Sequence, residues 1–128
     1  MTELKPQVYK DPRPPETFTR FHEWTRTHEP GWVYDAVRVL VTPIALFPYR
    51  TRAIGTENVP ASGPVVLAPN HFSNMDHFFL GVYIRRKVQF MAKSQLFSNP
   101  ILNYIFRVGG VFPVRRGYAD EEAFRTTY

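Results

Sequence analysis

The chain contains no cysteine among its 128 residues. Without thiols it forms no disulfide bond, offers no thiolate ligand to zinc and has no cysteine nucleophile for catalysis. A reducing, cytosolic setting is therefore compatible with the sequence.

Acidic residues are missing over a long stretch. No aspartate or glutamate lies between Phe78 and Ala119. The same stretch holds seven basic residues, Arg85, Arg86, Lys87, Lys93, Arg107, Arg115 and Arg116. An uncompensated positive field attracts anions such as phosphorylated small molecules, anionic lipid head groups or nucleic acid. The simpler interpretation, a solvated basic face, would normally include acidic residues for pairing.

A secretory signal and a long, uninterrupted apolar run are also missing. The best membrane candidate is "WVYDAVRVLVTPIALFPY", residues 32–49, which contains Asp35, Arg38 and Pro43. As a helix it would be about 27 Å long, slightly short for a membrane span. Its aromatic ends around an aliphatic middle favour a helix that lies in the membrane interface, and a buried core helix fits nearly as well.

The remaining pattern predicts an α/β domain. With 44% hydrophobic residues the chain has enough apolar surface for a core. Apolar runs between turn signals predict buried strands at residues 65–69, 88–92 and 111–114, and residues 50–55 are short enough for a further strand. Helices are expected at residues 17–30, 76–84, 94–110 and 118–128. Alternation of strands with helices is typical of α/β folds.

We divide the chain into three parts. Residues 1–16 hold four prolines and little periodic apolar content, which predicts a flexible tail. Residues 17–49 form a helical, membrane-associating segment. Residues 50–128 contain the alternating strands and helices.

The stretch "NHFSNMDHFFLG", residues 70–81, carries the clearest chemistry. His71 and Asp76 are five residues apart, so a continuous helix would turn them onto different faces, by about 500°. A turn after the expected strand at 65–69, with a helix starting near Ser73 or Asn74, would bring them together. The carboxylate would then orient the imidazole as a general base.

This arrangement is the base half of a catalytic triad, and no serine or cysteine in a suitable context supplies the nucleophile. A hydroxyl of the substrate is the natural candidate. The alternative is that Asp76 only places a negative charge at a helix N-terminus. His22, His28 and His77 are interpreted as surface or structural histidines.

Four ordered blocks resemble the glycerolipid acyltransferase family, which includes lysophosphatidic acid and glycerol-3-phosphate acyltransferases. "NHFSNMD" is similar to its N-H-x-S-x-x-D block, and "GTENVPASGP" to its lead-in. "MAKSQLF" resembles its K-x-x-L-F segment, and "GGVFPVRRG" its arginine block. The resemblance covers residues 55–128. A later E-G-T-R block has no counterpart here, which predicts that residues 50–128 are the N-terminal part of a truncated acyltransferase domain, with a mixed sheet flanked by helices and an apolar helix before it.

The resemblance implies acyl transfer from a thioester, acyl-coenzyme A or acyl carrier protein, to a hydroxyl of a glycerol phosphate. His71 would be the general base and Asp76 its partner. The expected substrate-binding residues are Arg116, Lys93, Asn70, Ser73 and Gly110, with Arg116 on the acceptor's phosphate. The reaction implies no metal and no resident cofactor. The protein would lie on the cytoplasmic face of a membrane.

The basic stretch and the apolar segment are also compatible with two other functions. A non-catalytic module that binds a membrane or anionic lipid would keep the apolar helix and the basic stretch. A nucleic-acid binder is disfavoured because the basic and aromatic residues match no groove-reading or stacking motif.

Overall fold

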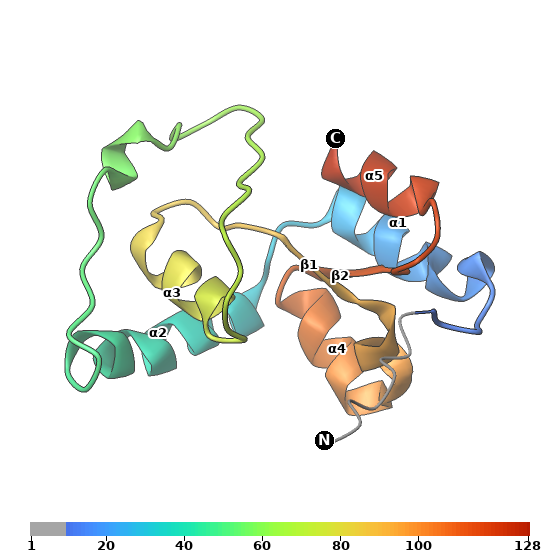
Figure 1. Ribbon diagram of the computed structural model, residues 1–128, viewed down its shortest axis with the longest axis horizontal. Helices are drawn as coiled ribbons and strands as arrows, with labels where there is room; N and C mark the ends of the chain where they lie inside the picture. Colours follow the sequence, from blue (N-terminus) through green and yellow to red (C-terminus); the bar gives the residue numbers. More distant parts are fainter. Residues whose placement is uncertain (1–9) are drawn as a thin grey trace, which may run out of the picture.

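A computed structural model describes residues 10–128 (Figure 1). The elements in chain order are η1 Pro15–Phe18, α1 Thr19–Thr27, α2 Trp32–Leu46, η2 Thr56–Asn58, α3 Asp76–Tyr83, β1 Phe90–Lys93, η3 Ser94–Ser98, α4 Pro100–Val108, β2 Val111–Val114 and α5 Glu121–Thr127. In Figure 1, α2 and α3 lie on one side of the molecule, and the two strands lie on the other with α1, α4 and α5.

A parallel β-α-β unit forms the centre of the second group. β1 and β2 pair from Phe90 opposite Val111 to Lys93 opposite Val114, and η3 and α4 make the crossover between them. The α/β class is therefore confirmed. The expected mixed sheet is not seen, because the two strands of the described residues are parallel.

Aromatic residues fill the core beside this unit. Phe18, Phe21 and Phe97 are buried together, and Phe106 packs against them from α4. The rings of Phe21 and Phe97 meet edge to face, with centroids 5.1 Å apart. Since Phe18 and Phe21 come from η1 and α1, the segment before α2 is part of the same core as the strands.

Local signals explain the crossover helix, as predicted. The Asn99 side chain accepts hydrogen bonds from the backbone N–H groups of Ile101 and Leu102 at 2.9 and 3.4 Å, and Pro100 occupies the first turn. The helix ends before Gly109, and Gly110 has a φ of +83°. A side chain at Gly110 would place its Cβ 2.5 Å from the Pro30 ring, so only glycine fits this turn.

The strands predicted at residues 50–55 and 65–69 are wrong. Both segments belong to a long arc, residues 47–75, whose only helical turn is η2. Val66 is 61% exposed, and no strand of the described residues pairs with this run. An apolar run becomes a strand only where a neighbour supplies hydrogen bonds and its faces are covered.

The helix expected within residues 32–49 forms as α2, over 15 residues. It buries Val33, Tyr34 and Ala45 but leaves Val39 and Leu40 exposed. Within residues 10–128 no helix combines the length and apolarity that crossing a membrane requires. The prediction of an apolar helix that precedes the domain is therefore not supported, although a helix forms at this place.

The predicted flexible tail lies partly outside the described residues, which begin at Lys10. From Asp11 onward the chain is held in place. The Asp11 carboxylate is buried and accepts a hydrogen bond from the Ser94 hydroxyl at 2.8 Å. Asp11 also forms an ion pair with Arg13 at 2.7 Å. A proline-rich composition does not reveal these contacts, so the prediction of a flexible tail is wrong for this part of the chain.

Candidate active site

The turn before α3 brings His71 and Asp76 together. One oxygen of Asp76, Oδ2, lies 2.9 Å from His71 Nδ1. The same oxygen accepts hydrogen bonds from the backbone N–H groups of Phe72 and Ser73 at 2.7 and 2.9 Å. The Ser73 hydroxyl accepts from the backbone N–H of Met75 at 3.1 Å, which closes the turn. The predicted meeting of the two side chains is confirmed.

The start of α3 differs from the prediction. The residue that precedes the helix is Met75, and its side chain makes no capping bond. Asp76 instead reaches backward from the first helical position to the N–H groups of the turn. The expected cap at Ser73 or Asn74 is therefore replaced by a carboxylate that organises the whole turn.

The hydrogen bonds around Asp76 favour its ionised form. Backbone N–H groups of Ser73 and Phe72 stabilise the carboxylate and lower the pKa of Asp76 below its ordinary value, with a further contribution from His71. An ionised carboxylate only accepts, so His71 Nδ1 carries the shared proton. In a neutral imidazole with this hydrogen bond the free lone pair is on Nε2, and the His71 side chain is 62% exposed to solvent.

A hollow of about 440 Å³ lies beside this turn. Its lining includes the polar residues Thr56, Asn70 and Asp76, and most other lining side chains are apolar or aromatic. They come from α3 and from the arc 47–75, and include Ile54, Val59, Phe79, Leu80, Tyr83 and Ile84. The Tyr83 hydroxyl donates a hydrogen bond to the Thr51 carbonyl oxygen at 2.6 Å and also lies 2.6 Å from the Thr51 hydroxyl. These contacts join α3 to the arc 47–75.

Charges on α2 hold α3 in position, a role that the sequence did not reveal. Arg38 donates to the carbonyl oxygens of Gly81 and Ile84 at 2.8 and 2.9 Å, at the C-terminal end of α3. Asp35 pairs with Lys87 at 2.8 Å, just beyond that end. The charges that interrupt the apolar pattern of α2 therefore fix the helix that begins with Asp76.

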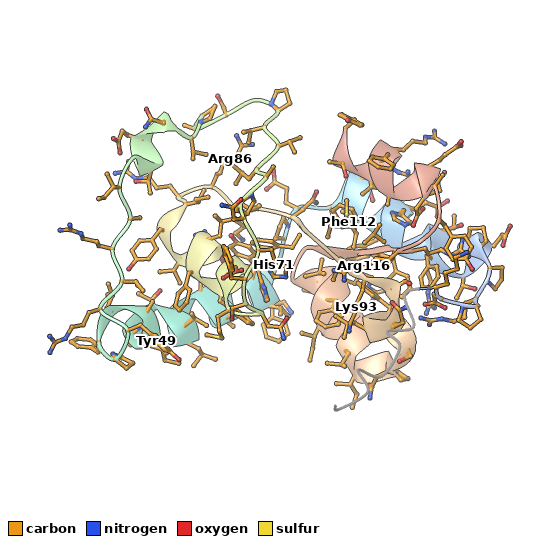
Figure 2. The ribbon with its side chains drawn as sticks, in the orientation of Figure 1. Tyr49, His71, Arg86, Lys93, Phe112 and Arg116 are labelled. Carbon is orange, nitrogen blue, oxygen red and sulfur yellow. The ribbon has the colours of Figure 1, made fainter. Side chains whose placement is uncertain are left out.

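Lys93 and Arg116 lie at a different place from His71 (Figure 2). Lys93 ends β1 opposite Val114, and Arg116 follows β2 by two residues, so both lie at the carboxyl ends of the parallel strands. Both side chains are exposed. Among the described residues neither forms a hydrogen bond or ion pair with His71 or Asp76.

The other three predicted substrate-binding residues, Asn70, Ser73 and Gly110, take part in the turn, the hollow or the backbone packing. Asn70 lines the hollow and Ser73 closes the turn. Gly110 packs against Pro30, and its carbonyl oxygen accepts from the backbone N–H of Phe90 at 2.8 Å.

The other histidines lie outside the turn. His22 is buried with Nδ1 2.9 Å from the Thr126 hydroxyl, and burial lowers its pKa. His77 is half-buried between Phe78 and Phe90, and burial lowers its pKa too. His28 stacks on Trp24 at the surface, with ring centroids 3.6 Å apart.

Comparison with known proteins places these observations in a family. The model of the Acyltransferase family matches residues 50–127. The chain is 32% identical over 75 residues to chloroplastic 1-acyl-sn-glycerol-3-phosphate acyltransferases of Brassica napus and Arabidopsis thaliana. That match covers 57% of this chain but only 22% and 21% of the two relatives, so it spans about a fifth of their length. No solved structure matches. Since the family model covers more than half of the sequence, including the His71–Asp76 turn, the chain belongs to the acyltransferase family.

Proposed function

We propose that the protein transfers a fatty acyl group from a thioester to a hydroxyl of a glycerol phosphate, with His71 as the general base. The observation that carries this proposal is the 2.9 Å contact between His71 Nδ1 and Asp76 Oδ2, which leaves Nε2 free. The names of the two relatives describe acyltransferases that act on 1-acyl-sn-glycerol 3-phosphate. This acceptor, lysophosphatidic acid, and glycerol 3-phosphate both carry the required hydroxyl.

The proposed reaction has two steps. His71 Nε2 takes the proton of the acceptor hydroxyl as its oxygen attacks the thioester carbonyl carbon. Asp76 stabilises the imidazolium that forms. When the tetrahedral intermediate collapses, the carbon–sulfur bond breaks and His71 returns the proton to the departing sulfur. The products are an ester and a free thiol, and the imidazole is neutral again.

The surroundings suit the two substrates. The hollow offers apolar side chains of Phe79 and Leu80 next to Asp76, where an acyl chain would be removed from water. Arg116 and Lys93 supply positive charge for the acceptor's phosphate, and arginine binds phosphate with two parallel hydrogen bonds. The donor would be acyl-coenzyme A or acyl carrier protein.

The test is transfer of a labelled acyl group from acyl-coenzyme A or acyl carrier protein to lysophosphatidic acid or glycerol 3-phosphate. We expect His71→Ala and Asp76→Ala each to lower kcat by at least about 100-fold, the usual contribution of a positioned general base. His28→Ala is the matched control, because the exposed imidazole contacts Thr27 and Trp24 at the end of its own helix, while the bond from Gln89 is to the backbone carbonyl that the variant keeps. Near-normal turnover in either active-site variant, or no transfer by the wild-type chain, would contradict the proposal.

The exposed face of α2 supports a further proposal, that the protein works at a membrane surface. Val39 and Leu40 are 71% and 69% exposed on this helix, and Phe47 and Tyr49 extend the apolar surface beyond its end. The exposed Arg50 follows directly and suits anionic head groups.

Sedimentation with vesicles of phosphatidylcholine and phosphatidylglycerol tests this surface. Leu40→Glu should weaken binding, whereas Ile101→Glu, at an equally exposed apolar residue of α4, should not. An equal loss of vesicle binding in both variants would contradict the proposal that the exposed face of α2 contacts the membrane. Vesicle binding without any acyl transfer would instead favour a non-catalytic lipid-binding module.

A further inference from the structure

The first described residues form a strap, Lys10–Arg13, that is fixed to η3, the 3-10 helix after β1. Asp11 is 1% exposed and accepts hydrogen bonds from Ser94 Oγ at 2.8 Å and from the Arg13 guanidinium at 2.7 and 3.0 Å. The Arg13 guanidinium holds the pKa of Asp11 well below its ordinary value. Arg13 also donates to the carbonyl oxygens of Ser94 and Phe97 at 2.8 and 3.3 Å.

This attachment places Lys10 beside the residues that follow β2. A Cβ built on Gly117 would lie 2.9 Å from Lys10 Cγ. The Lys10 ammonium lies 5.7 Å from the centroid of the Tyr118 ring, and the Arg115 guanidinium carbon lies 4.1 Å from the same centroid. Lys10 therefore joins Arg115 around one aromatic ring, next to Arg116.

We call this region the cationic edge, defined by Lys10, Lys93, Arg115 and Arg116. Within residues 10–128 none of these four side chains forms an ion pair with a carboxylate. Some basic residues elsewhere do, such as Arg26 with Glu122 and Lys87 with Asp35, while others, such as Arg20 and Arg85, form none among the described residues. What distinguishes the edge is that its four basic residues lie at or after the ends of β1 and β2 or against that segment.

The nearby acid, Asp120, forms no ion pair with these four side chains among residues 10–128. Asp120 is 7% exposed, and its oxygens accept from the backbone N–H groups of Arg115 and Ala123 at 2.8 and 3.3 Å. In addition, Arg115 Nε is buried without a hydrogen-bond partner in the part of the chain that the structure describes. An anion bound at this edge would be attracted by the unpaired positive charges and could accept hydrogen bonds from their N–H groups.

We propose that the strap is one wall of a phosphate-binding site at the cationic edge, and that Lys10 contacts the phosphate together with Arg116. Asp11 is a positioning residue, because its bond to Ser94 holds Lys10 at the edge. The proposal rests on the proposed function in one respect only, that the acceptor is a phosphate monoester. The phosphates of coenzyme A share this chemistry and are distinguished below.

Binding is measured by NMR titration of the full chain, following the backbone amides of Arg116, Gly117 and Tyr118. The probes are glycerol 3-phosphate, coenzyme A and, as the uncharged comparison, glycerol. Because no turnover is required, failure of the His71 experiment and failure of this one are separate results.

We expect Lys10→Gln to weaken phosphate binding about threefold, as the loss of one exposed charge contact does. Arg85→Gln is the matched control, since this exposed cation precedes β1 and lies toward the opposite end of the sheet. Unchanged binding by Lys10→Gln, an equal loss in Arg85→Gln, or binding of glycerol as tight as that of glycerol 3-phosphate would overturn the proposal.

Asp11→Asn separates position from charge. This variant loses one negative charge, which alone would strengthen anion binding, yet it weakens the attachment of the strap. Weaker phosphate binding would support the positioning role of Asp11, whereas equal or tighter binding would overturn it. If Lys10→Gln weakens the binding of glycerol 3-phosphate, the site belongs to the phosphate of the acyl acceptor. If it weakens only the binding of coenzyme A, the phosphate site remains but belongs to the acyl donor.

Discussion

Arg38 joins α2 to the end of α3, and removing its guanidinium is expected to destabilise the protein measurably. Its two short bonds to the carbonyl oxygens of Gly81 and Ile84 measure 2.8 and 2.9 Å. Buried hydrogen bonds to charged groups contribute about 1.5–3 kcal/mol each. Because Arg38 is only half-buried, we take about 1 kcal/mol for each bond. The guanidinium carbon of Arg38 lies 4.9 Å from the centroid of the Tyr34 ring, and this cation–π contact adds about 0.5 kcal/mol to the free energy of unfolding.

Arg38→Met keeps the aliphatic stem and removes these interactions. We expect the free energy of unfolding to fall by about 2–3 kcal/mol, measured by urea denaturation with an unchanged slope. Arg85→Met is the control, since an exposed arginine without these bonds should change stability by less than about 0.5 kcal/mol. If Arg38→Met costs no more than the control, the carbonyl oxygens are satisfied by water and the attachment of α3 has another source.

Two further predictions concern stability. Gly110→Ala should lower the free energy of unfolding by about 2–4 kcal/mol, because the new Cβ meets the Pro30 ring at a φ of +83°. Gly63→Ala, at a φ of +82° with no neighbour within contact distance, should lower it by only about 1 kcal/mol. Equal losses in urea denaturation would refute the clash with Pro30. Burial lowers the pKa of His22 in the folded state, so the unfolded chain binds its proton first as the pH falls. Stability should therefore be fully present above about pH 6.5 and fall below it, and His22→Gln should flatten that fall; an equally steep fall in the variant would assign it to other groups, His77 included.

Features set by neighbouring residues were predictable from the sequence. The crossover helix begins at Pro100 and ends before the two glycines, as these signals predicted, although the expected helix over residues 94–110 is divided into η3 and the shorter α4. The contact of His71 with Asp76 was predicted because the turn that makes it is built from the six residues between and including them. The hydrogen bonds of these elements join residues that are close in the sequence.

Features that need distant partners were not predictable. The run Val65–Pro69 has the composition of a buried strand, but whether it pairs depends on another segment. Arg38 and the carbonyl oxygen of Gly81 are 43 residues apart, and Asp11 and Ser94 are 83 residues apart. A single sequence does not show such pairs, so the charges of α2 looked like interruptions of an apolar helix and Asp11 looked like part of a tail.

The protonation state of the His71 imidazole is the most direct test of the account, because base catalysis requires a lone pair on Nε2. Nitrogen-15 NMR of the neutral ring distinguishes the two nitrogen atoms without any turnover. We predict that Nδ1 carries the proton in the wild-type protein and that Asp76→Ala shifts the proton toward Nε2. A proton on Nε2 in the wild type, or an identical spectrum in Asp76→Ala, would contradict the claim that the carboxylate aims this histidine at its substrate.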